Sequence, residues 1–98
     1  ATGTLVVGCS TSVIPGDKNI TRIGARAFTG CTGLKNIVIP DTITDIENDA
    51  LHGCSELEGV VLGSGLKHIG NQAFYNCLKM KSIVIPDGVI SIGADAFY

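Results

Sequence analysis

The stretch that decides the fold is residues 69–86, IGNQAFYNCLKMKSIVIP, because its pattern returns every 23 residues along the chain. Positions one period apart carry the same residue or a similar one. The clearest columns are Ile23, Ile46, Ile69 and Ile92; Ala27, Ala50, Ala73 and Ala96; Phe28, Leu51, Phe74 and Phe97; and Cys31, Cys54 and Cys77. A constant period of this length indicates a repeat protein, in which each unit packs on its neighbours.

The units are expected to form a single domain, residues 1–98. The full units are residues 20–42, 43–65 and 66–88. Residues 1–19 form an irregular first turn and residues 89–98 a truncated last one, as is common for terminal repeats that meet solvent on one side. One unit cannot bury its apolar side alone, whereas a stack of about four turns can.

Two stretches of each unit have the character of a short strand. Residues 34–39 alternate between inward and outward positions and end at Pro40, which cannot donate to a ladder. Residues 43–46 form a second extended piece, and residues 83–85 are expected to be the last strand. Parallel pairing of equivalent strands about 4.8 Å apart predicts an α/β repeat solenoid.

A short helix is predicted between the second extended piece and the cysteine of each unit. Ala73, Phe74 and Cys77 lie one helical turn apart, which favours one or two turns of α or 3₁₀ helix. The residue before this stretch is glycine in three units, at Gly24, Gly70 and Gly93. Glycine there indicates a backbone position that a Cβ disfavours, although Glu47 takes this place in the middle unit.

The four cysteines are expected to be buried thiols. Cys31, Cys54 and Cys77 hold the same place in successive units, so their side chains should point the same way. A disulfide needs two Cβ atoms about 3.8 Å apart and turned toward each other. A disulfide and a metal site are the alternatives, although no CxxC pair or zinc spacing is present. We therefore expect no metal and no cofactor.

Composition argues against several classes of function. The net charge is -2 and the 7 basic residues are scattered, whereas nucleic-acid binding needs clustered lysine and arginine. No apolar run approaches the length of a membrane span, so no membrane insertion is expected. The chain starts at Ala1 without a signal peptide. We expect a piece of a longer protein, or a mature chain whose export signal has been removed.

The pattern IGxxAFxxCxxLxxIxIPxxV, repeated over residues 20–98, closely resembles the BspA-like, or treponemal-type, leucine-rich repeat. The opening LVVGC…VIP resembles a first turn of that family. The resemblance implies a right-handed leucine-rich-repeat solenoid. It also implies a bacterial surface or secreted protein, in an extracellular or cell-surface location, that acts in adhesion or in binding host or microbial proteins. No catalytic residues come with the resemblance, so no enzyme activity is expected.

The best candidate for a protein-binding surface is the outward face of the strands. It presents two columns, Asn36, Gly59 and Ser82 in one and Val38, Val61 and Val84 in the next. An apolar stripe bordered by small polar residues can receive a protein partner. The alternative is plain strand propensity, which favours valine on either face and leaves a spacer array with no binding role of its own.

A second column consists of Arg22, Asp45, His68 and Ser91. If these side chains project outward, they form a surface charge ladder worth about 0–1 kcal/mol per pair. A metal or hydrolytic site that uses Asp45 and His68 is the alternative, although no nucleophile motif such as GxSxG accompanies them.

Self-association is expected through the C-terminal end, residues 83–98. Nothing in the chain covers the last predicted strand, and an uncovered edge invites pairing with another chain.

Overall fold

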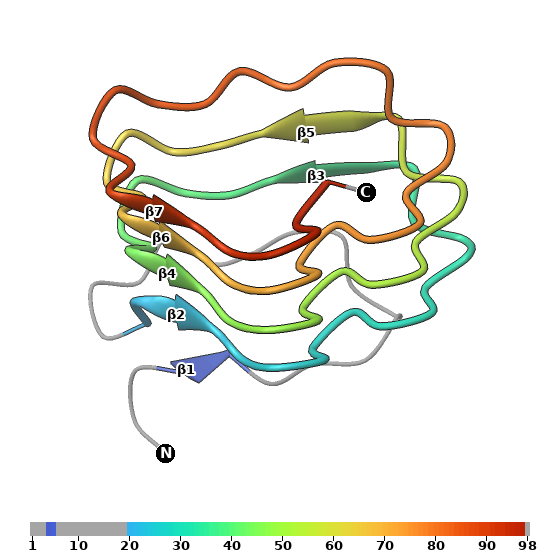
Figure 1. Cartoon of the computed structure of the whole chain (residues 1–98), viewed down its shortest axis with the longest axis horizontal. Coiled ribbons are helices and arrows are strands. Elements are labelled where there is room, and N and C mark those ends of the chain that lie inside the picture. Colours follow the sequence, from blue (N-terminus) through green and yellow to red (C-terminus); the bar gives the residue numbers. More distant parts are fainter. Residues whose placement is uncertain (1–3, 6–19, 98) are drawn as a thin grey trace.

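The computed structural model describes Thr4–Leu5 and residues 20–97, with side chains from Ile20 onward. The irregular first turn predicted for residues 1–19, which includes Cys9, lies outside the described residues apart from the backbone of Thr4–Leu5. Segments one period apart lie side by side in successive coils, as Figure 1 shows. None of the described residues belongs to a helix long and apolar enough to span a membrane.

Five short strands form one parallel sheet, sheet A, along one side of the stacked coils (Figure 1). In order they are β1 (Thr4–Leu5), β2 (Arg22–Ile23), β4 (Asp45–Ile46), β6 (His68–Ile69) and β7 (Ser91–Ile92). Arg22 pairs with Asp45, and Asp45 pairs with His68, so residues one period apart are direct neighbours. The expected parallel strands are thus confirmed. The handedness of the coil and the count of about four turns stay predictions.

A second parallel sheet, sheet B, contains β3 (Asn36–Val38) and β5 (Gly59–Val61). The prediction of a last strand at residues 83–85 is wrong, because this stretch makes no strand pairing. A hollow of about 560 Å³, bounded by Val61 and Val84 among others, opens between it and β5. This end segment has a neighbouring coil on one side only, so fewer contacts hold it in register.

Pairs of tight turns replace the predicted helices. In one such turn, Cys31 N–H donates to Phe28 C=O at 3.2 Å, and the third residue, Gly30, has φ 72°. Left-handed residues recur at equivalent places: Arg26, Asp49, Gln72 and Asp95 in the first turn of each pair, and Gly30, Gly53 and Asn76 in the second. A positive φ at the third residue is the mark of a type II turn. The prediction of helical segments is therefore wrong for residues 20–97.

Hydrogen bonds between coils explain why these segments do not close into helices. Phe28 N–H donates to Ala50 C=O of the next coil at 2.7 Å, and Gly30 N–H donates to His52 C=O at 2.8 Å. An α-helix would need these N–H groups for its own i−4 carbonyls. Alternate N–H groups instead point along the stack, and the helix-like spacing of inward side chains arises from two successive turns.

The glycine column is explained by the closeness of neighbouring coils. A Cβ at Gly70 would lie 2.7 Å from the backbone nitrogen of Asn48, and a Cβ at Gly93 would likewise meet the backbone of Asn71. The amides of the same coils join them further. Asn48 Oδ1 accepts a hydrogen bond from Asn71 N–H at 2.8 Å, and Asn71 Oδ1 accepts one from Ala94 N–H at 2.8 Å.

The core is made of the inward columns and is open at its C-terminal end. Leu51 is fully buried although it is smaller than Phe28 and Phe74, which are also sealed from solvent. In the last coil, by contrast, Ile92 is 48% exposed and Phe97 is 37% exposed. Burial therefore depends on a covering coil on both sides.

Gly70→Ala is expected to lower the free energy of unfolding by about 1–3 kcal/mol, because the added methyl group overlaps the backbone of the preceding coil. Gly33→Ala is the matched control, since nothing lies within 4 Å of a Cβ there. That change should leave stability within about 1 kcal/mol of the parent. Urea denaturation measures both, and equal effects would contradict the steric explanation.

Candidate functional site

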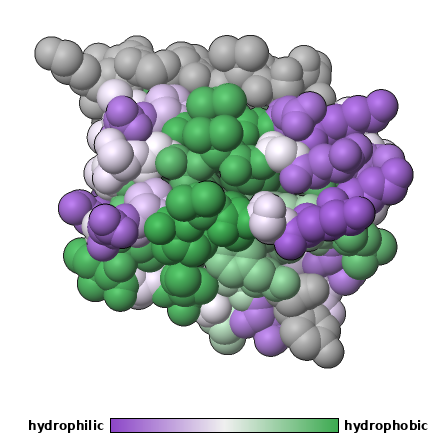
Figure 2. Space-filling model, turned by 90° about the horizontal axis from the view of Figure 1, so that it is seen from above, coloured by the Kyte–Doolittle hydropathy of each residue, from purple (hydrophilic) through white to green (hydrophobic). Residues whose placement is uncertain are grey.

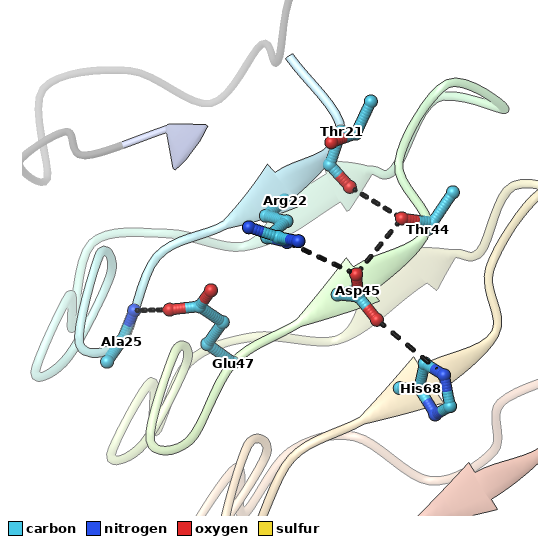
Figure 3. Close-up of polar contacts among 7 residues, drawn as sticks. All are labelled: Thr21, Arg22, Ala25, Thr44, Asp45, Glu47 and His68. Atoms are coloured by element: carbon cyan, nitrogen blue, oxygen red, sulfur yellow. Dashed lines mark hydrogen bonds and ion pairs between the residues drawn. The ribbon is translucent and has the colours of Figure 1, made fainter. Parts of the chain in front are cut away.

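Sheet A carries a row of polar side chains on its outer surface (Figure 3). Arg22 Nε donates to Asp45 Oδ2 at 3.4 Å, and His68 Nε2 lies 4.0 Å from Asp45 Oδ1. On its other side, His68 Nδ1 lies 2.7 Å from Ser91 Oγ. The structure thus brings together all four members of the predicted charge column. They line an open groove of about 590 Å³.

The geometry of this row suits a surface charge ladder better than proton transfer. Asp45 Oδ2 already accepts hydrogen bonds from Arg22 and from Thr44 Oγ1, the latter at 3.1 Å. Asp45 Oδ1 is beyond hydrogen-bonding distance of His68, whose side chain is 51% exposed. A catalytic histidine beside a serine is normally oriented by a carboxylate that accepts a hydrogen bond from its other ring nitrogen, and Asp45 is too far away to do so. Among the described residues, no three His, Cys, Asp or Glu side chains are placed to hold a metal ion.

Glu47 borders the same groove (Figure 3), and it is the residue that replaces glycine in the middle unit. Its hydrogen bond accounts for this replacement. Its Oε1 accepts a hydrogen bond from Ala25 N–H of the preceding coil at 3.3 Å. Ala25 is the counterpart of Asn48 and Asn71, whose amides bond the following coil. A carboxylate therefore joins the first two described coils where an amide is lacking.

The valine stripe, Val38, Val61 and Val84, lies on the outer surface of sheet B and the segment beside it. These side chains are 58%, 60% and 83% exposed. Figure 2 shows apolar surface gathered in the middle of this face, with hydrophilic surface on either side. The polar column predicted next to the stripe consists of Asn36, Gly59 and Ser82, of which Asn36 and Ser82 are exposed.

Two charged columns flank the valine stripe along the chain. Lys35, Glu58 and Lys81 precede it, and Asp41, Ser64 and Asp87 follow it, and all six are exposed. Ser64 N–H donates to Asp41 Oδ1 at 2.8 Å, which fixes one loop to the next. The ion pairs of the described residues include none of the lysines of these columns. Their ammonium groups are therefore available to a partner.

The cysteine column is only partly as predicted. Cys54 and Cys77 are free and buried, and their thiols donate to the carbonyls of Phe28 at 3.0 Å and Leu51 at 3.3 Å. Burial raises the pKa of Cys54, and burial together with the neighbouring Cys54 raises the pKa of Cys77 to about 12. Cys31, by contrast, is disulfide-bonded, so the expectation of a free thiol there is wrong. The equivalent positions of Cys31, Cys54 and Cys77 argue only against disulfides among these three residues.

Two contacts escaped the sequence reasoning because they depend on side-chain conformation. One is the hydrogen bond between His68 and Ser91, which the shared column made available but did not require. The other is the stacking of His52 on Tyr75, with ring centroids 4.9 Å apart and planes 15° apart. The available signal for this contact was the position of His52 one period before Tyr75.

Comparisons with known proteins agree with this geometry. The profile of the BspA type leucine rich repeat region matches residues 7–98. The structure is similar to that of a leucine-rich repeat protein from Treponema pallidum, with TM-score 0.85 and 28% identity over 94% of this chain and 43% of that one. A leucine-rich repeat protein from Bacteroides capillosus gives TM-score 0.77 and 30% identity over 83% of this chain and 64% of that one.

A leucine rich cell surface protein from Faecalibacterium prausnitzii is also similar, with TM-score 0.72 and 30% identity over 87% of this chain. This chain covers 26% of that protein. No curated protein matches the chain. With coverages of 43%, 64% and 26%, the chain spans less than two thirds of the length of each of the three solved structures.

Cys54 and Cys77 should resist a thiol reagent such as DTNB at pH 8 in the folded protein, because only the thiolate reacts and burial disfavours it. Denaturation without reductant should release two thiols per chain, and denaturation after reduction should release all 4 cysteines. Four thiols before reduction would contradict the disulfide at Cys31.

The free energy of unfolding should fall as pH rises from about 8.5 toward 12. Unfolded Cys77 loses its proton near pH 8.5, whereas the folded thiol keeps it until about pH 12. Alkaline pH therefore favours the unfolded state. Urea denaturation across pH 8–10.5 measures the slope, and Cys77→Ala should make it shallower. An unchanged slope in that variant would contradict the assignment.

Proposed function

Because the chain belongs to the BspA-type leucine-rich repeat family, we propose that it is a non-enzymatic protein-interaction module that acts through the outer face of sheet B. The family suggests protein interaction as the general role, and the face is the part specific to this chain. Its residues are Asn36, Val38, Gly59, Val61, Ser82 and Val84.

The valine stripe is the observation that carries this proposal. Val38, Val61 and Val84 are at least 58% exposed on neighbouring coils, so they form a continuous apolar strip rather than scattered residues. Such strips rimmed by polar groups mark interaction sites on soluble proteins. The face offers no aromatic anchor, so the interaction should be of modest affinity.

The location that we propose is extracellular or at a bacterial cell surface, with adhesion to host or microbial proteins as the role. The disulfide at Cys31 supports an oxidising compartment, since such bonds are rare in the cytosol. The Faecalibacterium prausnitzii relative is described as a cell surface protein, which also supports this location.

We propose as well that residues 1–98 form one domain whose C-terminal end can associate with another chain. Ile92 is 48% exposed and Phe97 is 37% exposed, whereas Ile69 and Phe74, one coil earlier in the same columns, are 2% and 1% exposed. An end coil whose inward columns stay open supports this second mode of contact.

Surface plasmon resonance against an immobilised panel of extracellular-matrix proteins, mucins and bacterial surface proteins tests the binding face. At least one panel member is expected to bind, and Val61→Lys should weaken that binding at least tenfold by placing a charge in the apolar strip. Ile90→Lys is the matched control, because Ile90 is 73% exposed against 60% for Val61 but directly precedes β7 of sheet A, and it should bind as the parent does.

Equal binding by the parent and the Val61→Lys variant would contradict a role for this face, and no binding across the panel would contradict adhesion to foreign proteins. A hydrolytic role for Asp45 and His68 would instead appear as release of p-nitrophenol from p-nitrophenyl acetate that is lost in the His68→Ala variant. We expect no such release above the rate of a denatured control.

A further inference from the structure

The binding face has a symmetry that its residue columns reveal. Each valine of the stripe stands midway between two flanking residues, three positions before it and three after it. The rows are Lys35, Val38 and Asp41; Glu58, Val61 and Ser64; and Lys81, Val84 and Asp87. The flanking residues lie outside the strands, because β3 spans Asn36–Val38 and β5 spans Gly59–Val61, and three residues reach at most about 10 Å from the stripe. One edge is therefore basic at both outer rows, and the opposite edge is acidic at the same rows.

A face with this pattern is complementary to itself in one orientation. Consider two copies packed face to face, with a two-fold axis running along the valine stripe. Each valine then meets its own counterpart, Lys35 of each copy faces Asp41 of the other, and Lys81 faces Asp87. Glu58 meets Ser64, an uncharged hydroxyl. All four pairs of facing charges are then opposite in sign.

The other two-fold orientation has the reverse electrostatics. An axis parallel to the strands would place Lys35 against Lys81, Glu58 against Glu58, and Asp41 against Asp87. Every facing pair of charges would then be alike, and like-charge contacts suppress an arrangement. The charge pattern therefore selects a single orientation, in which the two solenoids run side by side in the same direction.

We propose that the occupant of this face is a second copy of this chain, held by the valine stripe and by the pairs that Lys35 and Lys81 form with Asp41 and Asp87. Each half of the interface is the same surface patch, as in the commonest class of homodimer. The proposal rests on the proposed function, because it names the partner of the same face.

The shape of the face fits this arrangement. The hollow between β5 and the last coil is lined by Ser64 and Asp87 as well as by Val61 and Val84. In the selected orientation, the side chains of the second copy that arrive there are Glu58 and Lys81. A long cationic side chain facing Asp87 would fill space that the chain itself leaves empty.

Sedimentation equilibrium of the whole chain over a series from about 10 μM to 1 mM tests the proposal. The parent should form a dimer whose dissociation constant rises at least tenfold in the Val61→Lys variant, which places two lysines together on the axis. Leu78→Lys, which changes an exposed apolar side chain outside both the binding face and residues 83–98, should leave the dimer unchanged. A monomeric parent, or a dimer that survives Val61→Lys, would overturn the proposal.

Exchange of charges between two variants gives a stricter test. The acidic variant combines Lys35→Glu and Lys81→Glu, and the basic variant combines Asp41→Lys and Asp87→Lys. Each alone should be monomeric, whereas an equimolar mixture should form a heterodimer. Circular dichroism and thermal unfolding of each variant establish that it is folded before it is mixed.

The matched control is a variant that combines Lys67→Glu and Lys79→Glu. It has the same net charge as the acidic variant, but its two changes lie outside the flanking columns. Its mixture with the basic variant should dimerise at least tenfold more weakly. Equal association in both mixtures would overturn the proposed pairing. Because these measurements use no foreign protein, a failed dimer leaves the panel binding experiment to decide the proposed function on its own.

Discussion

The structure depends on backbone hydrogen bonds that join each residue to the residue one period away. This register brings Arg22 beside Asp45 and Asp45 beside His68, and it carries the turn at Phe28 onto the next coil. Neighbouring backbones then lie so close that Gly70 has no room for a Cβ. The same register gathers single inward residues into a core and single outward residues into stripes. A side chain in this fold therefore acts as a member of a column.

Columns are also what the sequence could predict. A period of 23 residues is enough to place Val38, Val61 and Val84 on one surface, because the register follows from the period alone. For the same reason, the period alone predicts that Arg22, Asp45, His68 and Ser91 lie in one row. Neither inference required knowledge of the backbone path within a coil, so the positions of the valine stripe and of the charge ladder could both be predicted from the sequence.

The path within a coil was harder to predict, because two successive type II turns and one helical turn space inward side chains alike. The distinguishing signal was the column Gly30, Gly53 and Asn76, whose residue types favour positive φ. The first turn of each pair hides that signal, since Arg26 and Gln72 adopt positive φ without being glycine. The disulfide at Cys31 and the loose segment at residues 83–85 depend on the ends of the stack, where the period no longer describes the environment.

The direction of the coil-to-coil hydrogen bonds has a mechanical consequence. Phe28 N–H to Ala50 C=O, Leu51 N–H to Ala73 C=O and Phe74 N–H to Ala96 C=O all point along the axis of the stack. Because each coil contacts only its neighbours, a force applied between the two ends of the stack acts on every layer of bonds at once. The chain then yields by losing coils one at a time from an end, and each lost coil releases 23 residues of slack. We therefore expect such a stack to lengthen under load in steps of one coil.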